Sequence, residues 1–160
     1  MKGIANLSRG FTLVEMLVTM GILAILAIAI LPLAKNAVKR EKEIELKRSL
    51  RIIRTAIDEY KKMADEKKFE FDEDSEGYPP TLEILVEGVE IKGEEGESEE
   101  TKLHKFLRRI PKDPMTNSYE WGLRAYKDDP DSLTWGGDNV YDIFTRSPGT
   151  AMDGTRYRDW

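Results

Sequence analysis

The chain has 160 residues, 34% of them charged, and a formal net charge of -5. This length allows one domain plus an extended element rather than two large hydrophobic cores. Cysteine is absent, which excludes disulfides and thiolate metal sites. The charge is unevenly distributed, because residues 35–54 are basic on balance whereas residues 65–100 are strongly acidic.

The N-terminal part of the sequence consists of a short leader and an apolar run. Residues 1–10 form the leader, which carries Lys2 and Arg9, and residues 11–34 form the run. A hydrocarbon core about 30 Å thick requires roughly 20 apolar residues in a helix, so the run predicts a transmembrane helix. No site of small residues for a signal peptidase follows it, so we expect any cleavage to come before Phe11.

Glu15 is the one ionisable side chain in the apolar run. A carboxylate inside a membrane helix costs free energy and therefore indicates a function. Cleavage of the Gly10–Phe11 bond would place a new amine about one helical turn from Glu15. The amine and the carboxylate would then be natural partners, within one chain or between neighbouring chains.

Gly10, Phe11 and Glu15, followed by the apolar run, resemble the prepilin motif of type IV pilins and of the pseudopilins of type II secretion systems. In that family a prepilin peptidase cuts after the glycine and methylates the new N-terminal phenylalanine. The resemblance implies that Glu15 neutralises the terminal amine of an adjacent subunit as the helices bundle into a filament. The alternative is an ordinary signal anchor that contains a glutamate.

The resemblance also implies a location. Basic residues lie on both sides of the apolar run, so the positive-inside rule leaves the orientation open. From the resemblance we expect the leader in the cytoplasm, a single pass through the bacterial inner membrane, and the C-terminal domain in the periplasm, where the filament forms.

Residues 35–68 are predicted to continue the same helix as an amphipathic element. Apolar residues three and four positions apart fall on one face of a helix. These are Leu46, Leu50, Ile53, Ile57, Tyr60 and Ala64, with Ile52, Ala56 and Met63 widening the face. The opposite face, which includes Arg54, should be solvated.

Gly21 and Pro32 are candidates for helix flexibility. Proline removes a backbone hydrogen bond, and glycine lowers helix propensity. Together they predict either a simple kink or a place where the helix extends locally as a subunit leaves the bilayer for a filament.

Residues 69–160 are predicted to form a small C-terminal domain, so the fold class is α+β and pilin-like. An acidic linker at residues 69–80 leads into a short helix at residues 82–86, which Thr81 would cap. The acidic, low-complexity run at residues 93–100 cannot build a core, so we expect it to be a surface loop.

A second short helix is predicted at residues 101–109, followed by two β-strands. Strand-forming residues at 119–126 and 140–145 are separated by turn signals. They predict a small antiparallel sheet laid against the apolar face of the long helix. Its aromatic side chains are expected to fill the core: Tyr119, Trp121, Tyr126, Trp135, Tyr141 and Phe144.

The C-terminal half of the sequence resembles the major (G-type) pseudopilin of the type II secretion system. The resemblance rests on Pro111-Lys112-Asp113-Pro114 with Asn117 and Tyr119 after it, on the strand at 141–144, and on Asp159-Trp160. Together with the N-terminal motif it covers most of the chain, and residues 69–100 match least.

Calcium is the one cofactor that this resemblance brings into question. In many major pseudopilins the loop after the last strand binds calcium, but the family's aspartate shortly after Phe144 is missing here. Asp153 and Asp159 remain as calcium candidates, with Asp138 and Asp142 as second choices. Calcium requires about six to eight oxygen ligands, and a lone Asp-Gly pair is more often a turn.

We expect a structural subunit rather than an enzyme, because no catalytic triad, phosphate loop or paired histidines occur. The resemblance implies that the chain polymerises into a pseudopilus that drives protein export. Its partners would be the prepilin peptidase, the inner-membrane assembly platform and minor pseudopilins. A type IV pilin of a surface fibre and a monomeric membrane-anchored binding domain are the alternatives. No nucleic-acid partner is expected, since lipid headgroups and acidic neighbours explain the basic stretch at 35–54.

Overall fold

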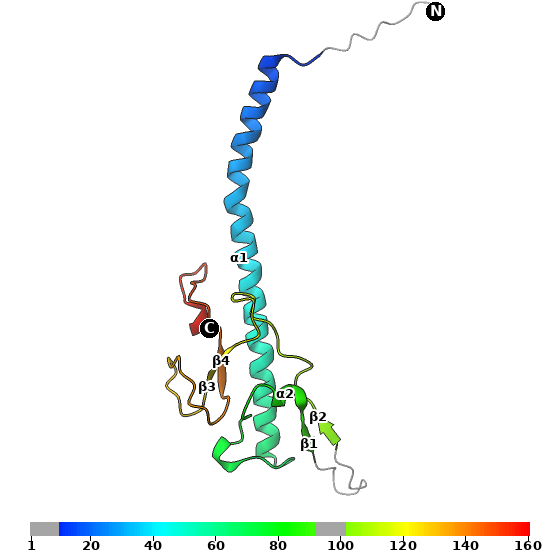
Figure 1. Ribbon diagram of the computed structural model, residues 1–160, viewed down its shortest axis with the longest axis vertical. Helices are drawn as coiled ribbons and strands as arrows, with labels where there is room; N and C mark the ends of the chain where they lie inside the picture. The colour runs from blue at the N-terminus through cyan, green and yellow to red at the C-terminus, as the bar shows by residue number, and fades with distance from the viewer. Residues whose placement is uncertain (1–9, 92–101) are drawn as a thin grey trace, which may run out of the picture. The chain divides into compact units, whose positions relative to one another are not determined.

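Helix α1 (Leu13–Asp65) is the longest element of the fold (Figure 1). The computed structural model describes residues 10–91 and 102–160, so the leader before Gly10 and the predicted acidic run lie outside the described residues. The chain divides into two compact units, residues 1–39 and residues 40–160. Helix α1 begins in the first unit and ends in the second.

The second unit contains the remaining described elements, which are all short (Figure 1). They are η1 (Glu73–Ser75), α2 (Ile84–Glu87), β1 (Val89–Ile91), β2 (Lys102–His104), β3 (Gly122–Arg124), β4 (Asp142–Phe144) and η2 (Tyr157–Asp159). Within the described residues the strands form two separate antiparallel pairs, β1–β2 and β3–β4. The predicted α+β class, with a long N-terminal helix packed on a domain of short helices and antiparallel strands, is confirmed.

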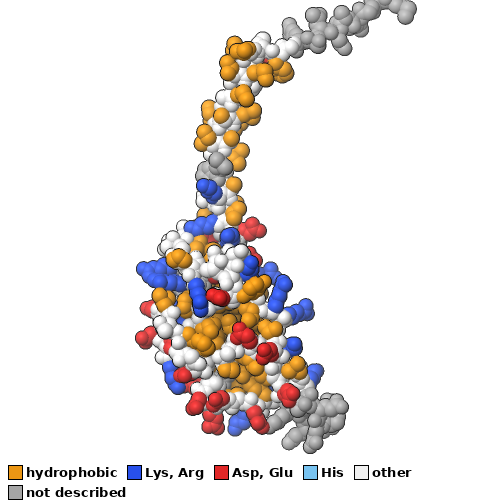
Figure 2. Space-filling view, viewed as in Figure 1, with side chains coloured by type: hydrophobic (Ala, Val, Ile, Leu, Met, Phe, Trp, Pro, Cys, Tyr) orange, Lys and Arg blue, Asp and Glu red, His pale blue; other side chains and the backbone are white. Residues whose placement is uncertain are grey.

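In the first unit, the apolar side chains of α1 are exposed on all sides of the helix. Leu13, Ile25 and Ile28 are 76%, 70% and 71% exposed, and Figure 2 shows apolar side chains along this part of the helix. Helix α1 continues without a break through Gly21 and Pro32. In the part of the chain that the structure describes, no helix is apolar over a long enough stretch to cross a membrane; the predicted transmembrane segment is therefore not shown.

In the second unit, one face of α1 forms the floor of the hydrophobic core. The predicted stripe is buried throughout, at Leu46, Leu50, Ile53, Ile57, Tyr60 and Ala64. Ala56 and Met63 are buried with it, whereas Ile52 is 41% exposed and lies at the margin. The helical period of the apolar residues therefore predicts the buried face correctly.

Helix α1 ends at Asp65 in a Schellman turn. Lys67 is left-handed, with φ 55°. Its N–H donates to the Ala64 carbonyl at 2.9 Å, and the Lys68 N–H donates to the Met63 carbonyl at 3.1 Å. These bonds satisfy carbonyls that the helix itself leaves unpaired, and they place the end of the helix close to the predicted one.

The acidic linker at residues 69–80 is part of the second unit and contributes to its packing. Phe69 is buried, and its ring meets that of Tyr60 edge to face, with centroids 4.9 Å apart. Ser75 is also buried, and its carbonyl accepts a hydrogen bond at 3.0 Å from the side-chain amide of Asn139. Parts of this segment therefore belong to the core despite its charge.

The predicted pairing of the two C-terminal strands is confirmed over shorter lengths. Strands β3 and β4 are antiparallel, with Gly122 opposite Phe144 and Arg124 opposite Asp142. A Cβ atom at Gly122 would lie 2.4 Å from the Phe144 ring. The ring therefore covers the strand only because glycine leaves room for it.

The second short helix predicted at residues 101–109 is wrong. Residues 102–104 form strand β2, which pairs with β1. The N–H groups of Phe106 and Leu107 then donate to the Leu85 carbonyl at 3.0 and 2.8 Å. Because long-range partners take these donors, the apolar periodicity of the segment does not produce a helix.

The first short helix begins later than predicted. Helix α2 starts at Ile84, and its N-cap is Glu83, which makes no capping bond through its side chain; Thr81 therefore does not cap it. Gly88 ends the helix with φ 91°, and a Cβ atom there would lie 2.4 Å from the carbonyl oxygen of His104. The glycine allows β2 to approach the end of α2.

The expected aromatic core is only partly right. Trp121 and Phe144 are buried. The other members are exposed, at 63% for Tyr119, 53% for Tyr126, 46% for Tyr141 and 37% for Trp135. Tyr126 and Tyr141 form a surface cluster with Tyr78, in which ring centroids lie 5.2, 5.3 and 5.7 Å apart. Tyr126 and Tyr141 lie just outside the paired residues of β3 and β4. The strand pairing therefore does not direct their side chains toward α1.

We expect Ile53→Ala to lower the free energy of unfolding by about 2–5 kcal/mol, because the side chain is fully buried and its loss leaves a cavity. The neighbouring substitution Ile52→Ala is the matched control and should cost much less. Denaturant titration of the full chain in detergent, followed by near-ultraviolet circular dichroism, measures both. Equal losses would contradict this description of the core.

Candidate processing and assembly site

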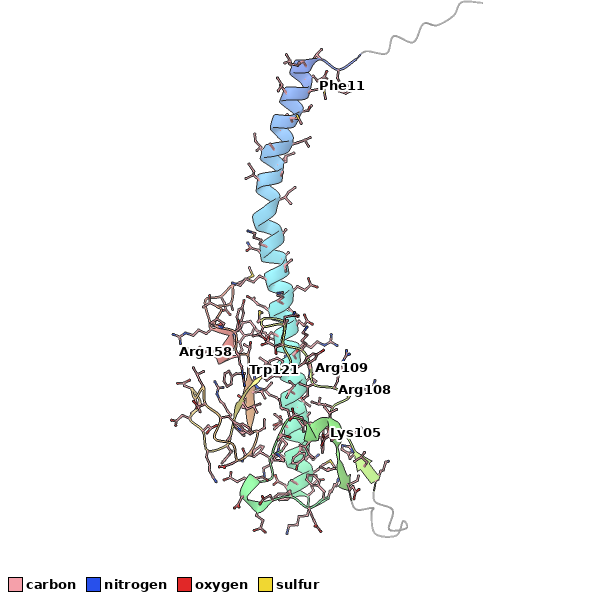
Figure 3. The ribbon with its side chains drawn as sticks, in the orientation of Figure 1. Phe11, Lys105, Arg108, Arg109, Trp121 and Arg158 are labelled. Carbon is pink, nitrogen blue, oxygen red and sulfur yellow. The ribbon has the colours of Figure 1, made fainter. Side chains whose placement is uncertain are left out.

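The Gly10–Phe11 bond lies in an exposed segment just before α1 begins. Neither residue belongs to a helix or strand, and Phe11 is 78% exposed. Figure 3 shows the Phe11 side chain beside the N-terminal end of α1. A Cβ atom at Gly10 would meet nothing within 4 Å. The fold therefore imposes no requirement for glycine there, and a peptidase can reach the bond without unfolding the helix.

Thr12 caps the first turn of α1. Its hydroxyl accepts a hydrogen bond from the Glu15 N–H at 3.2 Å, and its carbonyl accepts one from the Met16 N–H at 3.2 Å. A threonine followed three residues later by a glutamate is the capping-box pattern. This role of Thr12 is not among those predicted from the sequence, although the spacing of Thr12 and Glu15 is a sufficient signal for it.

Glu15 lies in the first turn of α1 with an exposed side chain. The positive end of the helix dipole favours a carboxylate at this position. In residues 10–91 and 102–160 no cation lies within ion-pair distance of it. The structure therefore brings Gly10, Phe11 and Glu15 together at one helix end, with the carboxylate open to a partner.

The C-terminal segment is held to α1 by a second group of charges. Arg54 donates to both carboxylate oxygens of Asp142, at 2.7 and 3.2 Å. It also donates to the carbonyls of Ile143 and Trp160, at 3.2 and 2.8 Å. Arg124 lies 3.6 Å from the same carboxylate. Arg54 was predicted to be solvated, but it is a bridge between the helix, β4 and the segment after it.

The calcium candidates are engaged with protein groups instead of with one another. Asp153 accepts hydrogen bonds from the N–H and the hydroxyl of Thr155, at 2.9 and 2.7 Å. The hydrogen bond from the Thr155 hydroxyl is the main cause of the lowered pKa of the Asp153 carboxyl. Asp159 lies 3.7 Å from its neighbour Arg158, and Asp142 is bound as described above.

Asp138, the remaining candidate, lies 4.0 Å from Lys127. Within the described residues no three His, Cys, Asp or Glu side chains are grouped so that they could hold a metal ion. The carboxylates at hand thus do not form the oxygen cage that calcium needs. Calcium binding stays a prediction from the resemblance.

Glu43 holds the loop after β4, a role that the sequence analysis missed. Its Oε1 accepts hydrogen bonds from the Met152 N–H at 2.9 Å and from the Tyr157 hydroxyl at 2.8 Å. Burial, followed by this bond to a carboxylate, raises the pKa of Tyr157 to about 12. No pattern near Glu43 indicates the role, because its partners are more than a hundred residues away in the sequence.

A family model described as the prokaryotic N-terminal methylation motif matches residues 6–31. No curated protein and no solved structure matches the chain significantly. The matched segment contains Gly10, Phe11 and Glu15 and supports a pilin-like protein. The motif implies processing by a prepilin peptidase and pilin-like polymerisation, and it suggests membrane anchoring with exposure to the periplasm.

The hydrogen bond from Tyr157 to Glu43 predicts a stability that depends on pH. The folded pKa of about 12 lies above the ordinary value of 10.0. The neutral phenol therefore stabilises the fold below pH 10, and this contribution is lost as the pH rises through the folded pKa. Near neutral pH, we expect the wild type to exceed Tyr157→Phe by roughly 1.5–3 kcal/mol in unfolding free energy.

Chemical denaturation at a series of alkaline pH values measures this difference, which should shrink as the folded pKa is approached. Tyr60 and Tyr78, whose pKa values burial also raises, are present in both proteins and cancel in the comparison. The exposed Tyr119→Phe is the control. A difference between wild type and Tyr157→Phe that stayed constant with pH would contradict the assignment.

Proposed function

We propose that the chain is a structural subunit of a pseudopilus, in the role of a major pseudopilin of a type II secretion system. A prepilin peptidase would remove residues 1–10 and methylate Phe11, and the processed chains would polymerise through the N-terminal part of α1. Each copy would start as a single-pass protein of the bacterial inner membrane, with its second unit in the periplasm. An inner-membrane assembly platform and minor pseudopilins would be its partners, and no catalytic activity is proposed.

One observation carries the proposal: the matched motif coincides with an open helix end. The motif covers residues 6–31, and within it the Gly10–Phe11 bond is exposed directly before the capped start of α1. Glu15 faces solvent in the first turn. These are the groups that cleavage, methylation and charge pairing would use.

The exposed apolar surface of the first unit supports assembly through α1. A helix that is apolar on all sides is stable when it is buried in a membrane or among other helices. In lipid, the gain from association comes from packing and from polar contacts between helices rather than from hydrophobic transfer. Polar groups in the first turn therefore have a large influence on which copies associate.

Glu15 is the polar group that would couple processing to assembly. A carboxylate moved into an apolar bundle loses hydration, and only a nearby opposite charge offsets that cost. The amine of a cleaved Phe11 on a neighbouring chain supplies such a charge. An uncleaved chain has an uncharged peptide group at this position, so it would be excluded from the bundle.

The sequence resemblance to major pseudopilins supports the secretion role, and the segment at 111–114 that carries it is packed into the second unit. Asp113 is fully buried and accepts a hydrogen bond at 2.8 Å from the Met115 N–H and another from the Thr145 hydroxyl. The indole of Trp121 donates to the Pro111 carbonyl at 3.0 Å. The segment thus joins β3 and the start of the loop after β4. A surface-fibre pilin would share the assembly step and differ in where its filament is found.

We expect Glu15→Gln to be processed normally but to fail to enter filaments. The amide keeps the shape of the side chain and leaves the bond between the Glu15 N–H and Thr12 intact, but it removes the charge. Mass spectrometry reports loss of the first ten residues and gain of a methyl group, and sedimentation with electron microscopy reports filaments. Thr12→Ala is the control: it removes the cap, at a cost of about 1 kcal/mol, but keeps the charge, so filaments should form.

Normal filaments from Glu15→Gln would contradict the charge-pairing step. A wild-type protein that kept its leader in a strain with an active prepilin peptidase would contradict the whole proposal.

We expect Gly10→Ala to retain the leader while the fold is unchanged, because the added methyl meets no neighbouring atom. Gly21→Ala is the matched control, since a Cβ atom there also meets nothing within 4 Å, and it should be processed. The mass of each protein purified from membranes decides the outcome. Cleavage of Gly10→Ala at the wild-type rate would place the processing site elsewhere.

A further inference from the structure

A groove runs along the second unit beside α1, on the side where residues 106–112 cross the helix. Two adjoining hollows make up the groove, and they share Ile52, Phe106 and Leu107 as lining residues. Ile52 is 41% exposed although it belongs to the widened apolar face of α1. The groove therefore has an apolar floor that the fold of a single chain leaves partly uncovered.

Basic side chains dominate the walls of this groove. The cations that line it are Arg48, Arg51, Arg108, Arg109 and Lys112, and the two carboxylates are Glu45 and Glu59. Glu59 lies 3.3 Å from His104. Figure 3 shows Lys105, Arg108 and Arg109 extending from the same flank of the unit, and Figure 2 shows basic side chains gathered at that edge.

These cations differ from four other arginines of the second unit in having no acidic partner among the described residues. Arg54, Arg124, Arg146 and Arg158 each lie within ion-pair distance of a carboxylate. In the described part of the chain no ion pair involves the five cations that line the groove. All five are exposed. The groove therefore presents a positive wall and an apolar floor, which suits an acidic segment of a partner.

The chain itself contains such a segment. Residues 93–100 include five glutamates and no basic residue. The segment connects the two strands at the end of the β1–β2 pair where Ile91 lies opposite Lys102. At the other end of the pair, where Val89 lies opposite His104, the chain continues toward the residues that line the groove. The attachment points of the acidic segment are therefore at the end of the pair away from the groove of the same chain.

The acidic segment of a neighbouring copy in a filament can reach the groove more directly than that of the same chain. The β1–β2 pair lies level with Glu59 on α1, as the contact between His104 and Glu59 shows. The groove extends from there toward Arg48, which is about 16 Å along the helix at 1.5 Å per residue. A parallel copy displaced by roughly this distance toward the N-terminus would bring its acidic segment level with the groove.

We propose that the groove docks the acidic segment at residues 93–100 of a neighbouring copy, so that a second, electrostatic contact joins subunits outside the helix bundle. This inference rests on the proposed function, because it needs copies that are parallel and staggered. Opposite charges that face each other across an interface mainly fix register and partner choice. The contact would therefore set how far one subunit is displaced from the next.

The absence of cysteine in the chain makes a direct test available. One copy carries Glu97→Cys and a second, with a different tag, carries Arg109→Cys. Both full-length proteins are produced together, filaments are collected by sedimentation, and disulfides are formed under mild oxidation. We expect a disulfide-linked dimer that carries both tags. Lys127→Cys in place of Arg109→Cys is the matched control, because this exposed lysine lies outside the groove, and it should form no such dimer.

Each other outcome overturns the inference in a distinguishable way. Filaments without the mixed dimer would refute the docking contact but leave the proposed function intact. A disulfide within one chain that carries both cysteines, without a mixed dimer, would assign the groove to the chain's own segment. Absence of filaments from the wild-type chain under the same conditions would refute the proposed function as well.

Charge reversal provides the second measurement. We expect Arg108→Glu with Arg109→Glu to lower filament yield about tenfold, because repulsion replaces attraction at exposed positions that do not support the core. Changing Glu94, Glu95 and Glu97 to Lys in the same chain should restore it. Unchanged filament yield, with weaker binding to vesicles of anionic lipid, would assign the groove to the membrane surface and overturn the inference.

Discussion

The change in the apolar pattern along α1 is the constraint on which the rest of the structure depends. From Leu46 to Ala64 the apolar residues keep to one face, and the small domain covers that face except at its margin, where Ile52 is 41% exposed. Before residue 39 the described apolar side chains are exposed on all sides of the helix. The C-terminal half of the helix therefore packs against its own chain, whereas in the proposed filament lipid or further copies would cover the N-terminal half.

Charged residues on the flanks of α1 determine how the C-terminal segment is held. Arg54 binds β4 and the last residues of the sequence, and Glu43 binds the loop between them. Both groups lie on turns of the helix that also contribute to the buried stripe. The packing of the helix therefore fixes the positions of both groups, and Glu43 holds the loop through hydrogen bonds. An ion added there would have to compete with the hydrogen bonds that Thr155 already donates to Asp153.

The sequence predicts what depends on local periodicity and misses what depends on distant partners. The helix, its buried stripe and the pairing of β3 with β4 follow from apolar spacing and strand propensity. The segment that contains β2 has a helical apolar pattern, yet its N–H groups find the Leu85 carbonyl, which no local rule reveals. Likewise, no local rule reveals the distant partners of Glu43 or the exposure of Tyr126 and Tyr141. At the N-terminus the motif was visible in the sequence, and only the cap by Thr12 was overlooked.

Acidic and basic regions alternate along α1 and the segment after it, and this order bears on how parallel copies could pair. The N-terminal carboxylate of the helix, Glu15, is followed by the basic stretch at 35–54 and then by the acidic residues beyond Asp65. In two parallel copies without displacement, like charges would face each other at every level. Displacement along the axis brings acidic groups of one copy beside basic groups of the next. In the proposed filament, a staggered, parallel arrangement would let Glu15 and the basic groove of the second unit each meet an opposite charge on a neighbouring copy.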